Sequence, residues 1–464
     1  MTDPGGTVSM PDGVAGAESG AEPALILVLR GDHPLGPPLR VSLADADSVV
    51  IGRGKQLGAH AAPGGPARSL AVTVPDRHIS STHLRLLRAP YGQWIVQDSG
   101  SKNGIALNGA RCDRATLSNG DVIDVGCSSF LYRVCPAWPV GEAGRRPVLD
   151  PLVTMSAALA ASFASIGLVA GSGLSILLMG QSGVGKEVVA RAVHELSGRR
   201  GAFVAVNCAA IPPNLVESTM FGHRRGSFSG ATESRAGMVR RAEGGTLFLD
   251  EIGELSPPAQ ASLLRVVQER EVVPVGESEP IPVDVRFVAA TNRDLWSDVE
   301  AGRFREDLLA RLTGLTVRLP PLRERREDLG LLVARLLRRV SPEPDAVRMT
   351  PRASRALVRY DWPRNVRELE SCLSAAILLA EGKDIDLHHL PAEIQKAAGP
   401  ATPSSTSSAP DQPRPSIAAL MDAHDGNISA VARALATSRS QVRRLLKRES
   451  GSSSSSSSTG EIDP

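Results

Sequence analysis

A glycine-rich loop behind a short apolar run restricts the fold of the central region more than any other feature of the chain. The run Ser175–Met179 leads into a helix-compatible stretch through Gly180, Gln181, Ser182, Gly183, Val184, Gly185 and Lys186. Glycines let backbone N–H groups approach phosphate oxygens, and a helix N-terminus adds partial positive charge. Lys186 is spaced to reach the β- and γ-phosphates of a nucleotide, whereas Glu187 replaces the usual magnesium-binding Ser or Thr. The alternative interpretation is an ordinary glycine-rich turn.

A second element decides between these interpretations. The apolar run that begins at Thr246 ends in Asp250 and Glu251, about sixty residues after the glycine-rich loop. Asp250 at a strand end is suited to hold magnesium, and Glu251 is suited to polarise an attacking water. An Asp-Glu pair alone is also common in solvated turns. Together, the two elements predict a P-loop nucleoside triphosphatase.

The spacing of apolar residues divides the chain into regions of different type. Short alternating runs separated by Gly, Asn, Asp and Pro are typical of a β-sandwich. Strands that alternate with helical stretches predict a parallel sheet. The expected parts are a disordered leader (1–23), an all-β sandwich (24–136), an α/β core (149–319), a helical region (320–398), a linker (399–415), a small all-α segment (416–449) and a disordered Ser-rich tail (450–464).

Composition excludes several classes of protein. The 52 Lys and Arg residues nearly balance 50 Asp and Glu, so a globally basic nucleic-acid coat is excluded. With 42% hydrophobic residues the chain has enough apolar side chains for several cores. The five cysteines lack CxxC spacing and indicate reduced thiols in a cytoplasmic protein, with neither disulfides nor a zinc site. The uncharged stretch Pro151–Gly185 is broken by Ser and Gly, which favours a buried helix and strand over a membrane span.

The central region resembles the AAA+ activators of sigma-54 RNA polymerase, the bacterial enhancer-binding proteins, over residues 149–390. The matching segments are Asn207–Ala210, Phe221–His223, Gly244–Thr246, Phe304–Leu308, Pro320–Arg325 and Trp362–Leu369. Glu187 also fits this family. The resemblance implies hydrolysis of ATP with Mg²⁺ in a homo-oligomeric ring, expected to be a hexamer. It implies that residues 320–398 form the lid, with Trp362 in the lid core.

The same resemblance assigns roles to individual residues. Asn292, just after a predicted strand, is expected to sense the γ-phosphate, and Arg367 in the lid is expected to act as a second sensor. Arg305 and Arg311 are expected to be arginine fingers that reach the neighbouring subunit's site. A guanidinium supplied in this way stabilises the charge of the transition state. The alternative for either arginine is a surface salt bridge.

One loop resembles the family's GAFTGA loop, which contacts sigma-54. It consists of Gly226, Ser227, Phe228, Ser229, Gly230 and Ala231. Ser227 replaces Ala and Ser229 replaces Thr, while the aromatic residue and the glycines are retained. The expected role is contact with sigma-54, and a repurposed loop is the alternative.

The C-terminal segment resembles the Fis-type helix-turn-helix. The residues expected on its recognition helix are Arg439, Ser440, Gln441, Arg443, Arg444 and Lys447. Basic and amide side chains on such a helix meet bases or phosphates in the major groove of DNA. Ala436 stands where Gly is common in the turn. A solvated basic helix is the alternative interpretation.

The N-terminal region resembles forkhead-associated (FHA) domains, which bind phosphothreonine peptides. The resemblance implies that Arg53, Ser80, Lys102 and Asn103 form the peptide site, where Arg53 and Ser80 hold the phosphate by charge-assisted hydrogen bonds. His83 is expected to brace the loop. Ser81 stands where the family often has Arg, and docking without phosphopeptide recognition is the alternative.

These features together predict a cytoplasmic ATPase that activates transcription. Its expected partners are sigma-54 RNA polymerase holoenzyme, upstream promoter DNA and a phosphothreonine-containing protein such as a Ser/Thr kinase, with no membrane. Two alternatives stay open: a DNA-binding regulator whose ATPase no longer engages sigma-54, and a phosphopeptide-docking scaffold whose assembly is controlled by ATP.

Overall fold

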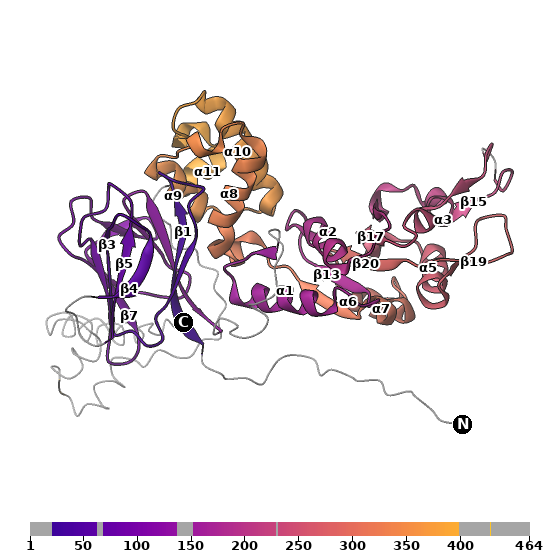
Figure 1. Ribbon diagram of the computed structural model, residues 1–464, viewed down its shortest axis with the longest axis horizontal. Helices are drawn as coiled ribbons and strands as arrows, with labels where there is room; N and C mark the ends of the chain where they lie inside the picture. Colours follow the sequence, from indigo (N-terminus) through magenta and orange to yellow (C-terminus); the bar gives the residue numbers. More distant parts are fainter. Residues whose placement is uncertain (1–20, 63–67, 137–151, 229–230, 399–426, 428–464) are drawn as a thin grey trace, which may run out of the picture. The chain divides into compact units, whose positions relative to one another are not determined.

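The structure of the protein is a computed structural model (Figure 1). It describes residues 21–62, 68–136, 152–228, 231–398 and Asn427. The chain divides into Met1–Ala401 and Thr402–Pro464, and all the described residues except Asn427 belong to the first part. Several predictions lie outside the described residues: the leader up to residue 20, Ser229 and Gly230, the linker 399–415, the helix-turn-helix 416–449 apart from Asn427, and the Ser-rich tail.

The N-terminal region is a β-sandwich of two six-stranded sheets, with strand orders β2-β1-β12-β11-β8-β9 and β10-β7-β6-β3-β5-β4. Trp94 and Phe130 are buried between the sheets. The strands are β1 (Glu22–Arg30), β2 (Leu39–Ser42), β3 (Ser48–Arg53), β4 (Gly58–Ala61), β5 (Ser69–Val74), β6 (Leu84–Arg88), β7 (Trp94–Asp98), β8 (Ile105–Leu107), β9 (Ala110–Cys112), β10 (Arg114–Thr116), β11 (Val122–Val125) and β12 (Ser128–Cys135). The predicted all-β class is confirmed.

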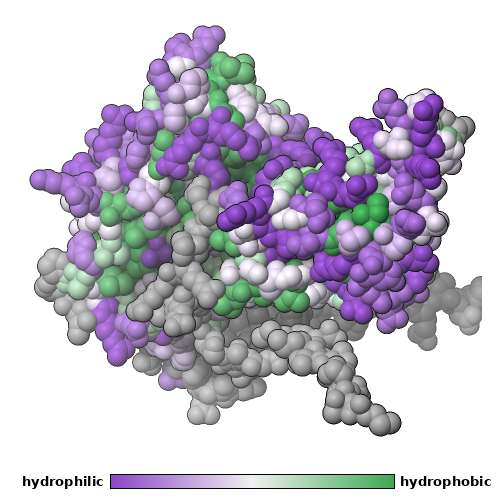
Figure 2. Space-filling model, turned by 45° about the vertical axis from the view of Figure 1, so that its right-hand side comes forward, coloured by the Kyte–Doolittle hydropathy of each residue, from purple (hydrophilic) through white to green (hydrophobic). Residues whose placement is uncertain are grey.

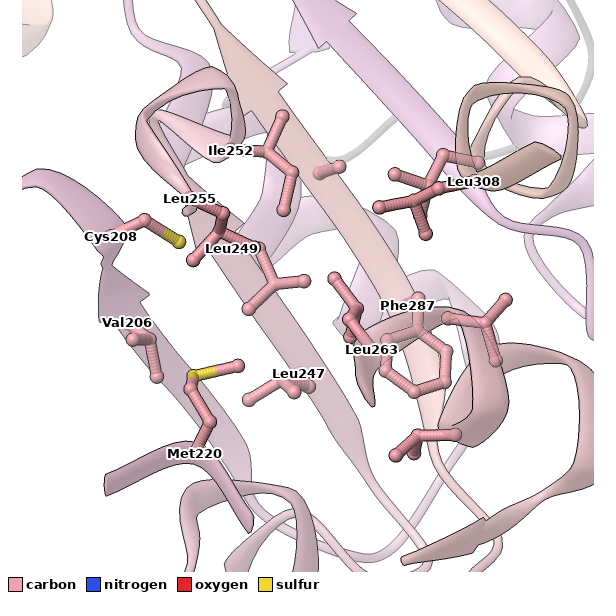
Figure 3. Packing of buried hydrophobic residues seen from close by; sticks show 14 of the residues in the cluster. Val206, Cys208, Met220, Leu247, Leu249, Ile252, Leu255, Leu263, Phe287 and Leu308 are labelled. Carbon is pink, nitrogen blue, oxygen red and sulfur yellow. The ribbon is translucent and has the colours of Figure 1, made fainter. Parts of the chain in front are cut away.

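The central region is built on a five-stranded parallel sheet with the order β14-β17-β20-β13-β21. Its strands are β13 (Ile176–Met179), β14 (Phe203–Asn207), β17 (Thr246–Asp250), β20 (Arg286–Thr291) and β21 (Leu315–Arg318). The central strands are buried on both faces, which explains their nearly continuous apolar sequences. Figure 3 shows one of these faces, where Leu247, Leu249 and Phe287 pack with Leu263 and Leu308 from helices. The predicted α/β class is confirmed.

Helices and two short hairpins surround this sheet. The helices are α1 (Ala157–Val169), α2 (Lys186–Ser197), α3 (Val216–Phe221), α4 (Met238–Arg241), α5 (Pro257–Glu269), α6 (Leu295–Glu300) and α7 (Glu306–Leu312). The hairpins pair β15 (Gly222–His223) with β16 (Arg235–Ala236) and β18 (Glu271–Val272) with β19 (Ile281–Pro282). These two-residue strands carry too little alternation to be recognised in the sequence.

The lid is helical, as predicted. Its helices are α8 (Leu329–Val340), α9 (Pro351–Arg359), α10 (Asn365–Ala380) and α11 (Ala392–Ala397). Trp362 is 1% exposed, and its indole N–H donates to the Leu357 carbonyl at 3.0 Å, so its assignment to the lid core is confirmed.

The prediction of a buried helix within Pro151–Gly185 was wrong in one respect. Helix α1 buries only one face, and Leu168 on it is 68% exposed. Its sequence is uncharged all round, so periodicity gave no sign of which face meets solvent. None of the helices among the described residues is long and apolar enough to cross a membrane. Figure 2 shows a face on which hydrophilic side chains prevail and hydrophobic ones form separate patches.

Candidate functional site

The glycine-rich loop joins strand β13 to helix α2 at the carboxyl end of the parallel sheet, and Lys186 is the first residue of that helix. Gly180, Gly183 and Gly185 have φ angles of 156°, 77° and 104°, which side chains disfavour. A Cβ on Gly183 would lie 2.4 Å from the Arg364 carbonyl oxygen of the lid. The loop therefore needs glycine both for its conformation and for its contact with the lid.

Three predicted residues meet beside this loop, because β17 and β20 are parallel neighbours whose carboxyl ends lie at the same edge. Lys186 Nζ lies 3.4 Å from Glu251 Oε1 and donates to the Gly180 carbonyl at 2.9 Å. The other carboxylate oxygen of Glu251 accepts the backbone N–H of Asn292 at 3.2 Å. Glu251 itself has a φ of 52°, a conformation that is uncommon for residues other than glycine.

Burial changes the acidity of groups around these carboxylates. Desolvation raises the pKa of Asp250 above its ordinary value, and the nearby Lys186 ammonium opposes this effect. Burial also raises the pKa of the Cys208 thiol to about 12, with Asp250 and Glu251 adding to the shift. A buried carboxylate of raised pKa gains most from a cation, so Asp250 suits the predicted role of magnesium ligand.

A cavity of about 440 Å³ adjoins the loop and extends between the α/β core and the lid. Its lining combines residues 182–189 and the carboxylates Asp250 and Glu251 with lid side chains such as Arg335, Arg339 and Arg367. Arg367 also donates to the Ser182 hydroxyl at 3.4 Å. The predicted P-loop, acidic residues and lid arginine thus surround one cavity large enough for a nucleotide.

Glu187 lies on the cavity rim, and the two predicted arginine fingers lie elsewhere. Glu187 is exposed and pairs with Arg191 one helical turn away at 2.7 Å. Arg305 is half exposed and pairs with Asp307 at 2.7 Å, and Arg311 is exposed on α7. Neither finger is among the residues that line the cavity beside the glycine-rich loop. Both guanidinium groups are accessible to solvent.

Two polar residues that the sequence did not single out hold the glycine-rich loop from the lid side. Asn365 is fully buried and donates to the Ser182 carbonyl at 3.0 Å, while its own carbonyl accepts the Leu322 N–H. The guanidinium of Arg325 is also buried and donates to the Val184 carbonyl at 2.7 Å. Both residues lie in motif segments, but only their burial identifies them as partners of the loop.

The loop that contains Phe228 is flanked by the hairpin β15–β16. Phe228 is 37% exposed and meets His223 edge to face, with ring centroids 5.0 Å apart. The N–H of Gly226 donates to the Ala231 carbonyl at 2.8 Å, which closes the loop at its base. The aromatic ring is therefore presented partly to solvent, as predicted for this position.

The four predicted peptide-binding residues are brought together at one end of the sandwich. The N–H of Arg53 donates to the Ser80 carbonyl at 2.9 Å, and that of Lys102 donates to the Ser80 hydroxyl at 3.3 Å. Asn103 donates from its side chain to the His78 carbonyl at 2.8 Å. Fully buried His83 contacts the Ser80 N–H and the Gly104 carbonyl, so its bracing role is confirmed.

Comparisons with known proteins agree with this architecture. A sigma-54 interaction domain matches residues 152–318, an AAA+ ATPase lid domain matches residues 323–407, and an FHA domain matches residues 49–126. These matches define the central region as an AAA+ nucleoside triphosphatase of the sigma-54 type, preceded by an FHA domain.

Curated relatives include two proteins named transcriptional regulatory protein ZraR. The one from Salmonella typhimurium is 44% identical over 61% of this chain, which spans 65% of that relative. The one from Escherichia coli K12 is 43% identical over 66% of this chain and 68% of that relative. NtrX from Brucella abortus with ADP is 31% identical over 64% of this chain and 69% of that chain, with a TM-score of 0.49. The chain belongs to the family of bacterial transcriptional regulators that contain a sigma-54 interaction domain.

Proposed function

We propose that this protein hydrolyses ATP to activate sigma-54 RNA polymerase at promoters, from an upstream DNA site. The observation that carries the proposal is the cavity that the P-loop, Asp250 and Glu251 of a sigma-54 interaction domain share with Arg367 of the lid. We further propose that the chain works as a hexameric ring, in which Arg305 and Arg311 are supplied to the neighbouring subunit's site.

The residues of the site fit a nucleotide with Mg²⁺. The left-handed glycines leave backbone N–H groups of the loop unobstructed by side chains, and Lys186 adds a positive charge at their centre. Mg²⁺ held through Asp250 would neutralise charge on the phosphates. Glu251 would orient and deprotonate the attacking water, while Asn292, whose N–H fixes Glu251, would sense the γ-phosphate.

Coupling to the polymerase is assigned to the loop Gly226–Ala231. Partly exposed Phe228 offers an apolar contact that a partner can bury. The helix-turn-helix 416–449 would tether the ring to DNA through Arg439, Arg443 and Arg444. The FHA domain would bind a phosphothreonine-containing protein through Arg53 and the residues beside it, and so bring a kinase signal to the ATPase.

Transcription in vitro from a sigma-54 promoter, with purified protein, ATP and sigma-54 RNA polymerase, tests the proposal. Wild type is expected to produce open complexes, Phe228→Ala to hydrolyse ATP without opening the promoter, and Glu251→Gln to do neither. The matched aromatic control is Tyr91→Ala, because Tyr91 is 82% exposed on the FHA domain. A wild type that hydrolyses ATP but opens no promoter would favour a DNA-binding regulator that no longer engages sigma-54.

A further inference from the structure

The FHA domain and the lid share one hydrophobic core. Val28, Leu29 and Leu131 from β1 and β12 belong to the same buried cluster as side chains of the lid helices α8, α9 and α10. Figure 1 shows β1 beside α8 and α9, which both contact it. Since each of these FHA side chains is at most 3% exposed, the contact is packed like a domain interior.

A glycine permits this close approach. Gly330, in the first turn of α8, lies against strand β1, and a Cβ on it would stand 1.9 Å from the Val28 carbonyl oxygen. The next atoms that such a Cβ would meet are the Val28 carbonyl carbon at 3.1 Å and the Leu29 Cα at 3.8 Å, both on the same strand. Alanine is the better helix former, so this glycine serves the contact with the FHA domain and not the helix.

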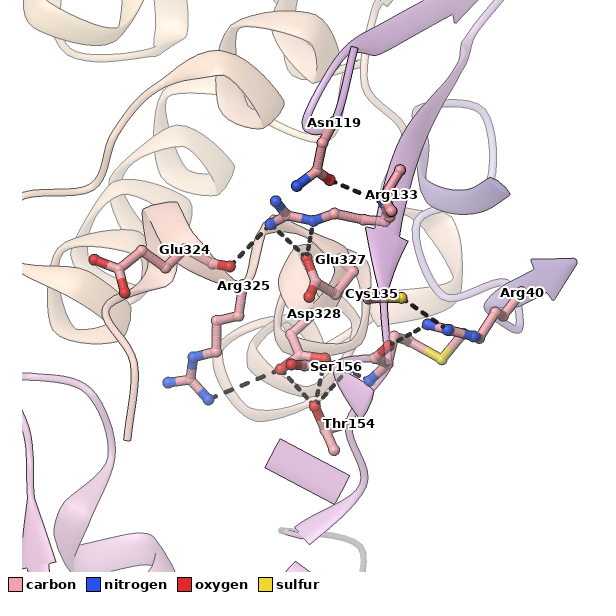
Figure 4. Close-up of polar contacts among 12 residues, drawn as sticks. Arg40, Asn119, Arg133, Cys135, Thr154, Ser156, Glu324, Arg325, Glu327 and Asp328 are labelled. Carbon is pink, nitrogen blue, oxygen red and sulfur yellow. Dashed lines mark hydrogen bonds and ion pairs between the residues drawn. The ribbon is translucent and has the colours of Figure 1, made fainter. Parts of the chain in front are cut away.

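Ion pairs cross the same contact. Arg359 of α9 pairs with Asp124 of β11, and both side chains are at least nine-tenths buried. Arg133 of β12 donates to Glu327 at 2.9 Å and to the Glu324 carbonyl at 2.8 Å (Figure 4). Charges that are buried in this way are stable only while each keeps its partner. The two surfaces therefore match in charge as well as in shape.

From Glu327 the contacts continue to the glycine-rich loop. The next residue, Asp328, accepts the Thr154 hydroxyl and the Met155 N–H, and it faces Arg325 at 3.9 Å (Figure 4). Arg325 in turn donates to the Val184 carbonyl of the loop at 2.7 Å. One short segment of the lid thus touches the FHA domain on one side and the nucleotide cavity on the other.

A second set of contacts leads from the lid to the predicted peptide site. Arg355 of α9 donates to the Gly126 carbonyl at 3.0 Å. The next residue, Cys127, donates its N–H to fully buried Asp76 at 2.7 Å, and its thiol lies 3.2 Å from His78. The His78 carbonyl accepts the side chain of Asn103. The peptide loops and the lid are therefore joined by continuous polar contacts.

We propose that the FHA domain docks on the lid through β1, β11 and β12, and that this docking surface couples the FHA domain to the nucleotide cavity. The coupling to a phosphopeptide rests on the proposed function, whereas the docking and its effect on nucleotide binding do not. Docking orders the segment that carries Arg325, so its loss weakens nucleotide binding.

Gly330→Ala in the full-length chain tests the docking. It adds one methyl group that meets Val28 while favouring the helix that bears it, so the lid stays folded. The matched control is Gly167→Ala in α1, where a Cβ meets nothing within 4 Å. Amide hydrogen exchange in β1, β12 and α8 is expected to rise roughly tenfold or more in Gly330→Ala and to stay as in wild type in Gly167→Ala. Arg133→Ala, which adds no volume, is expected to act in the same direction.

Binding of a fluorescent, non-hydrolysable ATP analogue tests the coupling. The expected result is about tenfold weaker binding in Gly330→Ala and weaker binding in Arg133→Ala. The control Gly167→Ala is expected to bind the analogue as tightly as wild type does. Unchanged hydrogen exchange in both variants would overturn the docking surface. Faster exchange with unchanged or tighter nucleotide binding would overturn the coupling. Neither readout uses polymerase or phosphopeptide, so failure of the proposed function leaves both tests intact.

Discussion

Replacing Glu251 by Gln is expected to abolish hydrolysis while leaving nucleotide binding intact. Glu251 contacts Lys186 at 3.4 Å and the Asn292 N–H at 3.2 Å. The amide keeps the size of the carboxylate and one oxygen for the Asn292 N–H, so the geometry of the cavity is retained. It has no negative charge with which to accept a proton from water.

The role of Glu251 and its contacts set the expected loss of hydrolysis and the expected loss of folding stability in Glu251→Gln. Loss of the general base costs about 10²–10⁴-fold in kcat, which corresponds to roughly 3–5 kcal/mol of activation free energy. Loss of the charged contact to Lys186 costs about 1.5–3 kcal/mol of folding stability at most, and the ammonium keeps the Gly180 carbonyl as a partner. Hydrolysis is therefore expected to collapse while the folded protein and its nucleotide affinity persist.

Steady-state phosphate release and binding of an ATP analogue measure the two quantities in parallel. The control is Glu195→Gln, the same substitution on the exposed side of α2, which is expected to match wild type in both assays. Glu251→Gln with more than about a tenth of the wild-type kcat would refute the assignment of Glu251 as general base. Loss of analogue binding in this variant would instead refute the claim that the cavity keeps its geometry.

Three further predictions concern single side chains. Burial raises the pKa of Asp250, so the folded protein loses stability as pH rises through that pKa. Asp250→Asn should remove this loss and therefore unfold at a higher temperature than wild type at neutral pH. The same variant should lack Mg²⁺-dependent hydrolysis. A lower unfolding temperature would contradict it. Trp362→Ala should lower the free energy of unfolding by about 3–5 kcal/mol in denaturant titration. Arg53→Ala should weaken calorimetric binding of a phosphothreonine peptide about tenfold or more, with Arg85→Ala, exposed on β6, as the unaffected control.

The sequence determined the parts that depend on local chemistry. Glycines followed by Lys186 predicted a phosphate-binding loop because few other residues tolerate its dihedral angles, and the structure has them at φ values between 77° and 156°. An apolar run ending in Asp250 predicted a buried parallel strand with a carboxylate at its end, which β17 is. Alternation between turn residues predicted the β-sandwich. In each case the pattern lies within a few neighbouring residues.

Only the tertiary structure decided which distant residues support these parts. Asn365 and Arg325 lie in segments that match the family, but the sequence does not show what they contact. Their burial against Ser182 and Val184 makes them partners of the glycine-rich loop. Gly330 looks like a weak helix former, yet its missing side chain admits strand β1 of a domain some three hundred residues earlier in the chain. Sequence patterns carry local propensity and the spacing of apolar residues, whereas steric fit and charge pairing between distant segments exist only once the chain has packed.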